Sequence, residues 1–250
     1  MTTKTNARTA DNHLTRGELE KLSIRSLHAA RNWSKAEVAL LEWPPGSGQR
    51  VVVKDLRRRP LWYRLLAGRY SLTREWKAMR ALEDLPAVPR VIARPDADCI
   101  VMEFRDGQTL MDVETLSTET VQALVKTIED VHGRGVTHGD LHRSNLLLAE
   151  DGSISVIDWA TACVFGPQRR AIKGWTFNEW RALDRRAIAK VKAQYAPQLL
   201  SPEEHDLLVN GSSTLYRKVK NVRHVFELLR GRVAWGAGRG KNRYRDSSNS

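Results

Sequence analysis

Short runs of apolar and β-branched residues dominate the first part of the chain, a pattern that is typical of strands. The runs lie at residues 26–30, 37–43, 50–54 and 99–104. Turn-forming residues at 44–48, Pro-Pro-Gly-Ser-Gly, separate the second run from the third and favour a hairpin there. The pattern therefore predicts a small, strand-rich unit within residues 21–104.

Apolar residues recur every three or four positions in other stretches, which predicts helices. Leu72, Trp76 and Met79 form one such stripe, and Ser117 is a suitable cap for a second helix that ends near Gly133. Further helices are expected at 181–195 and after residue 201. The prediction is an α+β protein with a mostly helical second unit at 105–232, flanked by disordered polar ends at 1–20 and 233–250.

Composition narrows the class of protein. The chain has 250 residues, of which 41% are hydrophobic, and no apolar run approaches the roughly 20 residues that a membrane-spanning helix needs. Only Cys99 and Cys163 are present, too few for a disulfide framework. The polar start has no signal-peptide core, so we expect a cytoplasmic protein, with the inner face of the membrane as an alternative location.

Charge adds a preference for anionic partners. The 41 Lys and Arg residues exceed the 29 Asp and Glu residues, giving a formal net charge of +12. Phospholipid head groups, nucleic acid and phosphorylated substrates are all compatible with such a surface. Nucleic acid is the weakest of these interpretations, because the sequence contains no recognisable reading motif with interleaved aromatic residues.

Two polar clusters in the second unit carry the candidate chemistry. Asp140 and Asn145 lie in the stretch Val136 to Leu148, and Asp158 follows the apolar run that ends at Ile157. Carboxylate and amide oxygens at this spacing are suited to Mg²⁺ and to the hydroxyl of an acceptor. Each of the three side chains taken alone would more commonly cap a turn.

These residues resemble the catalytic motifs of the protein-kinase-like phosphotransferases. His138-Gly139-Asp140 stands where protein kinases carry His-Arg-Asp, and Ile157-Asp158-Trp159 stands in place of Asp-Phe-Gly. Glycine before the aspartate, and His142 two residues after it, make the chain more similar to RIO-type, small-molecule and lipopolysaccharide-sugar kinases. The resemblance implies a two-lobed kinase fold, with ATP and Mg²⁺ as cofactors.

The resemblance also implies roles for individual residues. Asp140 would accept or orient the acceptor hydroxyl, and Asn145 and Asp158 would hold Mg²⁺. Lys54 would lie over the α- and β-phosphates, paired with Glu75 of the following helix, although a solvated glutamate is the commoner case. His142 would contact the γ-phosphate, whereas His138 is expected to be buried and to brace the loop.

The stretch that ends at residue 104 resembles the hinge between kinase lobes. Met102 would line the adenine pocket, and the backbones of Glu103 and Arg105 would bind the base, although a buried strand and turn would look the same. Two features depart from the family. Residues 31–35 contain no glycine where a phosphate loop belongs, and Gly139 replaces the arginine that reads an activating phosphate.

Residues 57–70 form an apparent insertion that bears on the acceptor. Leu61, Trp62, Leu65 and Leu66 gather on one side of a helix edged by arginine, a pattern of helices that lie on anionic membranes. The alternative is a helix that packs on its own lobe. By resemblance we expect a lipopolysaccharide core sugar or similar membrane-associated sugar as acceptor. A RIO-like Ser/Thr protein kinase and a non-catalytic binding module are the alternatives.

Overall fold

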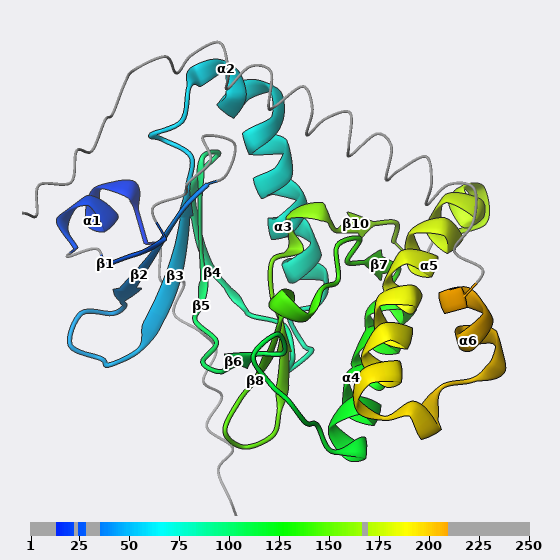
Figure 1. Ribbon diagram of the computed structural model, residues 1–250. Coiled ribbons are helices and arrows are strands. Elements are labelled where there is room, and N and C mark those ends of the chain that lie inside the picture. Colours follow the sequence, from blue (N-terminus) through cyan, green and yellow to red (C-terminus); the bar gives the residue numbers. More distant parts are fainter. Residues whose placement is uncertain (1–13, 23–24, 29–35, 167–169, 210–250) are drawn as a thin grey trace, which may run out of the picture.

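The computed structural model describes residues 14–22, 25–28, 36–166 and 170–209. The N-terminal unit is built on an antiparallel five-stranded sheet with the strand order β1-β2-β3-β5-β4 (Figure 1). Valine-rich β3 lies in the middle of this sheet, so it presents Val51 and Val53 to one face and Lys54 to the other. The strands span Arg25–His28, Glu37–Glu42, Arg50–Asp55, Val91–Asp96 and Cys99–Glu103 for β1 to β5.

The N-terminal end differs from the sequence prediction. Residues 1–20 were expected to be disordered, but Arg16–Lys21 forms helix α1. Thr15 and Glu18 cap it reciprocally. The buried Leu14 and Leu19 pack on the face of the sheet that carries Val51 and Val53. The prediction is therefore wrong for residues 14–20, while residues 1–13 lie outside the described part of the chain.

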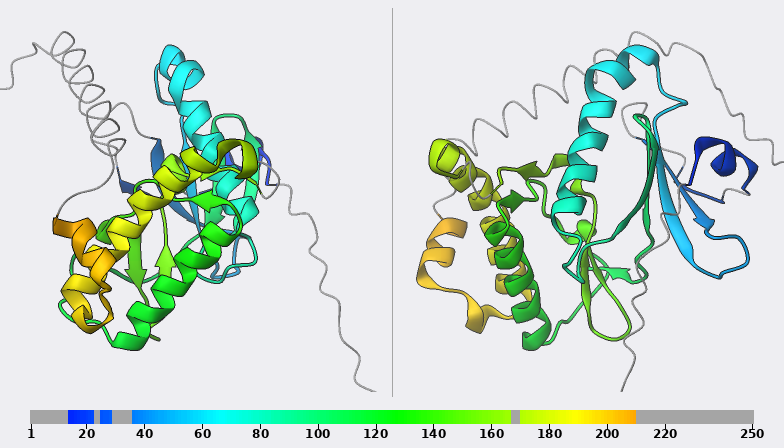
Figure 2. Two further views of the ribbon diagram at one scale, coloured as in Figure 1. Left: turned by 90° about the vertical axis from the view of Figure 1, so that its right-hand side faces the viewer. Right: turned by 180° about the vertical axis from the view of Figure 1, so that it is seen from behind.

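One continuous helical segment crosses the opposite face of the sheet (Figures 1 and 2). It consists of α2 (Leu61–Tyr63), a π-helical turn (Arg64–Gly68) and α3 (Arg69–Ala81). Arg69 N–H donates to the Arg64 carbonyl, the wider spacing that defines a π turn. Of the predicted insertion at residues 57–70, positions 61–70 therefore form an N-terminal extension of the helix that carries Glu75.

The second unit is mainly helical, as predicted. Helices α4 and α5 pack against each other, and α6 packs on α5 (Figure 2). Ser117 Oγ caps α4 by accepting from Thr120 N–H at 3.1 Å, which confirms the expected start. Helix α5 begins well before the predicted residue 181. The helices span Thr118–Gly133 (α4), Arg170–Tyr195 (α5) and Pro202–Val209 (α6).

Two small sheets position the loops between α4 and α5. Strands β6, β8 and β9 form one antiparallel sheet, and β7 pairs with β10 in the other. Single 3₁₀ turns follow β7 and β9, at Arg143–Asn145 and Trp159–Thr161. The strands span Gln108–Thr109 (β6), Val136–Thr137 (β7), Leu146–Leu148 (β8), Ile154–Val156 (β9) and Cys163–Val164 (β10).

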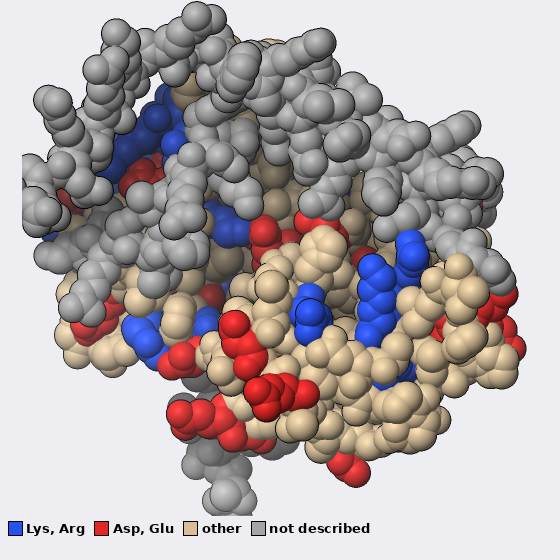
Figure 3. Space-filling model, in the orientation of Figure 1, with Lys and Arg blue, Asp and Glu red and all other residues tan. Residues whose placement is uncertain are grey.

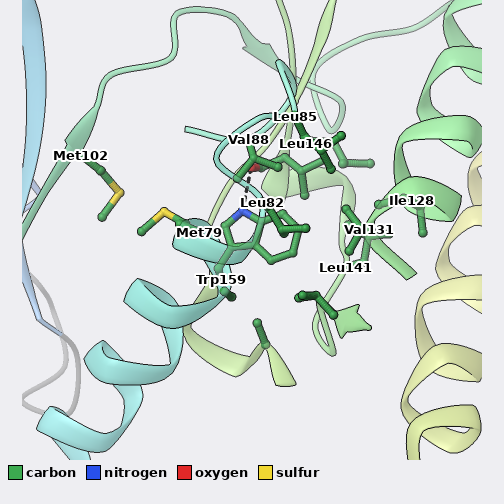
Figure 4. Packing of buried hydrophobic residues seen from close by; sticks show 14 of the residues in the cluster. Met79, Leu82, Leu85, Val88, Met102, Ile128, Val131, Leu141, Leu146 and Trp159 are labelled. Atoms are coloured by element: carbon green, nitrogen blue, oxygen red, sulfur yellow. Dashed lines mark hydrogen bonds between the residues drawn. The ribbon is translucent and has the colours of Figure 1, made fainter. Parts of the chain in front are cut away.

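The main core joins the two units around Trp159. This side chain is fully buried, and its Nε1–H donates to the Val156 carbonyl at 3.0 Å (Figure 4). Figure 4 shows residues from both units around the indole, among them Met79, Leu82, Val88, Leu141 and Leu146. The large indole therefore packs the loop that carries Asp158 against the helix that carries Glu75. The predicted α+β architecture with two lobes is confirmed.

Candidate active site

A half-buried lysine links the two units. Lys54 Nζ lies 2.6 Å from Glu75 Oε1 and 3.2 Å from Asp158 Oδ1. Lys54 comes from the central strand β3, Glu75 from the middle of α3, and Asp158 from the loop after β9. The structure therefore brings together three residues that the sequence analysis placed in one site, across 104 positions of the chain.

The burial of these groups is unequal. Glu75 is only 1% exposed, although the sequence placed it on the flank of the apolar stripe. Burial disfavours the charge on Lys54, but the carboxylates of Glu75 and Asp158 outweigh it and raise the pKa of the ammonium group. Burial also raises the pKa of the Glu75 carboxyl, against the opposing effect of Lys54. Lys54 is therefore held as a cation that faces the more exposed Asp158.

The loop after β7 presents Asp140 and His142 to each other. His142 Nε2 lies 2.7 Å from Asp140 Oδ1, so the imidazole sits directly beside the carboxylate expected to act on the acceptor. Asn145 ends the following 3₁₀ turn, and its Nδ2 donates to the Asp140 carbonyl at 3.0 Å. This contact uses the amide nitrogen of Asn145, which leaves the side-chain oxygen as the ligand atom for a cation.

Backbone geometry brings Asp158 beside Asn145. Ile157 N–H donates to the Asn145 carbonyl at 2.9 Å, so the two segments lie side by side where β8 begins and β9 ends. Asp158 has φ 63°, the only positive φ of a non-glycine residue in the described part of the chain. Such a conformation costs free energy and persists where the surroundings impose it, often at functional sites. A carboxylate, an amide oxygen and a nearby second carboxylate are a donor set that suits Mg²⁺.

His138 is buried, as expected, and braces the loop. Its Nε2 lies 3.0 Å from the Ile157 carbonyl, and its ring lies 4.7 Å from that of Trp159. This contact ties the segment of Asp140 to the segment of Asp158. The fully enclosed imidazole is consistent with the expected bracing role.

Asp184 is a site residue that the sequence analysis missed. Its carboxylate is fully buried and accepts from His138 N–H at 2.8 Å and from Gly139 N–H at 2.9 Å. The same carboxylate lies 3.0 Å from His132 Nε2. A signal was present: Asp184 shares the buried side of α5 with Phe177, Ile188 and Val191, where an acidic residue needs a partner.

Aromatic packing explains the glycine before Asp140. Gly139 has φ 79°, and a Cβ there would lie 2.7 Å from Trp180 Cζ3. Any side chain at this position would be strained and would press on Trp180 and on the Thr161 carbonyl, so the packing accounts for the glycine. Arg74 of α3 lies over Trp180, with its guanidinium carbon 5.9 Å from the ring, and its Nε donates to the Ala162 carbonyl at 2.8 Å.

The stretch expected to bind the base forms the end of β5. Met102 is buried in the core that joins the units, and Figure 4 shows its side chain directed toward Met79. Glu103 N–H already donates to the Arg90 carbonyl at 2.9 Å, so this amide is engaged within the N-terminal unit. Arg105 Nη2 donates to the Val88 carbonyl at 3.1 Å. The glycine-free segment 31–35 lies outside the described residues.

Comparison with known proteins agrees with this geometry. A family model described as the RIO domain matches residues 62–169, which include Glu75, Asp140, Asn145 and Asp158. The fold is shared with a Rio2 kinase from Chaetomium thermophilum solved as an ADP/Mg²⁺-phosphoaspartate complex, with a TM-score of 0.51 and 18% identity. That match covers 72% of this chain and 57% of the other, and a second structure of the kinase gives a TM-score of 0.52.

Similar proteins of known name are protein kinases, and each match covers a shorter stretch of the chain. CBL-interacting serine/threonine-protein kinase 21 of Arabidopsis thaliana is 32% identical over 103 residues, covering 38% of this chain and 25% of the relative. Human 3-phosphoinositide-dependent protein kinase 1 is 34% identical over 64 residues, covering 26% of this chain and 12% of the relative. The chain thus spans a quarter or less of the length of these relatives.

Proposed function

We propose that this chain, which has the protein-kinase-like fold and is similar to RIO-type kinases, is an ATP- and Mg²⁺-dependent phosphotransferase that acts on a hydroxyl group. The observation that carries the proposal is the Lys54 ammonium, which lies between Glu75 at 2.6 Å and Asp158 at 3.2 Å. A cation fixed in this way beside the Asp158 carboxylate, with Asn145 on the segment next to that of Asp158, suits a magnesium–nucleotide complex. A non-catalytic binding module would not need all of these groups.

Nucleotide binding falls to residues of both units. Lys54, held by Glu75, would neutralise the α- and β-phosphates, while Asp158 and Asn145 would hold Mg²⁺. The bound Mg²⁺ would supply charge neutralisation at the phosphate oxygens. Met102 would close the back of the adenine pocket, and the backbones of Glu103 and Arg105 would pair with the base.

Transfer itself falls to the loop after β7. Asp140 would orient the acceptor hydroxyl and accept its proton. His142, with Nε2 2.7 Å from Asp140 Oδ1, would in its protonated form bring positive charge to the γ-phosphate. Asp184 would keep the loop in place through its bonds to the amides of His138 and Gly139.

A protein Ser/Thr hydroxyl is the acceptor that the comparisons favour. The similar Arabidopsis and human proteins are serine/threonine or phosphoinositide-dependent protein kinases by name, and the matched family model is the RIO domain. This favours the RIO-like alternative over the sugar acceptor expected from the sequence. A membrane-associated acceptor such as a lipopolysaccharide core sugar remains a second candidate, because Leu61, Trp62, Leu65 and Leu66 are exposed in the helix that carries Glu75.

The proposal is tested by incubating the protein with γ-labelled ATP and separate protein, lipid-extractable and small-metabolite fractions. We expect Asp140→Asn to lower label transfer by at least about 100-fold, because a general base typically contributes a factor of 10² to 10⁴. Asp158→Ala should abolish transfer and also the Mg²⁺-dependent rise in melting temperature caused by ATP. The labelled fraction identifies the acceptor class.

Asp151→Asn is the matched control, since Asp151 lies in the exposed β8–β9 turn and its hydrogen bonds, one of them accepted from Ser153 N–H at 2.9 Å, are made to Ser153 within that turn. It should transfer label at the wild-type rate. Near-wild-type turnover by either site variant, with a normal melting curve, would refute the proposed function.

A further inference from the structure

An exposed apolar face lies on the N-terminal part of the helical segment 61–81. The outer face, as we call it, comprises residues that are 51–78% exposed: Leu61, Trp62, Leu65, Leu66 and Tyr70. These are five of the eight large apolar residues exposed in the described part of the chain, drawn from only ten consecutive positions. Apolar side chains gathered in this way mark an interaction surface more often than scattered ones do.

The inner side of the same segment is firmly attached to the N-terminal unit. Tyr63 is buried, and Gly68 lies so close to Leu56 that an added Cβ would be 3.0 Å from its Cδ1. Arg69 Nε lies 2.8 Å from Asp98 Oδ1, and Arg64 also pairs with Asp98. These contacts fix which side of the segment faces outward, so the outer face is presented by a rigid helix.

The π turn contributes to the shape of the outer face. Its wider turn at Arg64–Gly68 holds Leu65 and Leu66, two neighbours in sequence, both outward at 55% and 78% exposure. At the two ends of the turn, the Arg64 side chain pairs with Asp98 and the Gly68 backbone packs against Leu56, so both face the body of the protein. π turns of this kind are frequent at functional sites.

We propose that the outer face docks the protein on an anionic lipid bilayer. Leucines together with Trp62 and Tyr70 match the mixture that sits at the boundary between acyl chains and head groups. Arg57 and Arg58 lie in the turn that precedes the segment, with side chains 51% and 81% exposed. Their surface pairs with Glu20 and Glu37 are weak interactions that head-group phosphates would replace readily.

The distribution of charge favours lipid over a second copy of the chain. Figure 3 shows acidic and basic side chains interspersed on one face of the described part. By sequence, residues 210–250 hold ten Lys or Arg and two Asp or Glu, which accounts for eight of the twelve excess positive charges. A polybasic segment is the second signal that lipid anchoring commonly requires, whereas two chains of the same strong charge repel each other.

Docking through the outer face would bring the proposed active site near the lipid surface. Glu75 follows Leu66 by nine residues, which is about 14 Å along a helix. Tyr70 lies next to Arg74, with ring centre and guanidinium carbon 5.5 Å apart, and Arg74 in turn lies over the Trp180 ring. Trp180 packs against Gly139, the residue before Asp140. The inference goes beyond the proposed function, and its test needs no catalysis.

Vesicle flotation tests the inference with the full chain. The vesicles contain phosphatidylcholine alone or phosphatidylcholine with phosphatidylglycerol. We expect wild type to float with the anionic vesicles and to lose this binding at high salt. Leu65→Glu/Leu66→Glu should lower the partition coefficient at least about tenfold, because it removes two apolar side chains and adds two negative charges.

Met111→Glu/Val209→Glu is the matched control. It adds the same charge at apolar residues that are 60% and 67% exposed elsewhere, and should bind like wild type. Melting curves establish that both variants fold, and Leu66→Ser provides a milder version of the change. Equal loss in the two double variants, equal binding to neutral vesicles, or lipid-free self-association that only the Leu65/Leu66 variant abolishes would overturn the proposal.

Discussion

The two ends of the helical segment 61–81 break the usual rule of burial in opposite directions. Glu75 is a carboxylate that is only 1% exposed, whereas Leu66 is an apolar side chain that is 78% exposed. A buried charge costs free energy unless it is paired, and an exposed leucine contributes nothing to the core. Glu75 is therefore tolerated only because it is paired, whereas the exposure of Leu66 has no counterpart in the packing of the fold.

The difference between the ends lies in the partner. Glu75 finds its partner within the chain, since Lys54 Nζ lies at 2.6 Å, and so it can be predicted from motifs and then measured. The Leu66 side chain points to solvent, so the molecule that would cover it must be inferred from the chemistry of the exposed face. The middle of the segment, where Arg64 and Arg69 bind Asp98, holds the two ends in a fixed relation.

The largest effect is expected at the buried end. Glu75→Ala should lower the free energy of unfolding by roughly 3–5 kcal/mol, the cost of leaving one partner of a buried ion pair without the other. It should also abolish phosphoryl transfer, because Lys54 would no longer be held against the nucleotide. Urea unfolding and the γ-labelled ATP assay measure the two effects separately.

A double variant separates the electrostatic role of the pair from its packing. Lys54→Met/Glu75→Leu replaces both charges by apolar groups of similar volume, so stability should return to near wild type while transfer stays absent. A Glu75→Ala protein with wild-type stability and turnover would show that the pair is incidental to both.

Most of the site could be predicted from the sequence because its residues belong to short local motifs. Asp140 and Asn145 are five positions apart, and Asp158 ends a strand, so their placement depends on nearby turns rather than on distant packing. Lys54 and Glu75 were paired only through the resemblance, and the structure places them together. Their roles in catalysis remain predictions.

The features that sequence missed depend on long-range contacts. Asp184 lies 46 positions from His138, and no local pattern links its carboxylate to the loop amides. Helix α1 has a capping box, but its stability also depends on Arg16, which binds Asp55 and Asp96 from two strands. The fold class followed from periodicity, whereas such single contacts between distant segments did not.

An effect of intermediate size is expected when the pH is lowered, because Arg64 and Arg69 in the middle of the segment pair with the Asp98 carboxylate. Hydrogen bonds from Arg69 and Arg64 hold the pKa of Asp98 below its usual value, although burial opposes this. The stabilisation is therefore present above the unfolded pKa of about 3.9 and is lost as the pH falls toward the lower folded value. Asp98→Asn should cost roughly 1–3 kcal/mol at neutral pH and flatten the profile of unfolding free energy below about pH 4.

Glu150→Gln provides the control for this profile, because Glu150 is exposed and should leave its slope unchanged. Parallel profiles for wild type and Asp98→Asn between neutral pH and pH 3 would show that Arg64 and Arg69 are not what fixes the segment.

The smallest effect is expected at the exposed end, and it decides what kind of surface the outer face is. Leu66→Ala should change the free energy of unfolding by less than about 0.5 kcal/mol, as is usual for exposed positions. The same change at Leu72, which is 3% exposed on the next turns of the helix, should cost roughly 2–5 kcal/mol. If urea unfolding gave equal losses, Leu66 would belong to the core and the docking inference would have no exposed face to rest on. A stable, fully active Leu66→Ala protein with weakened vesicle binding would instead separate the face that binds from the face that folds.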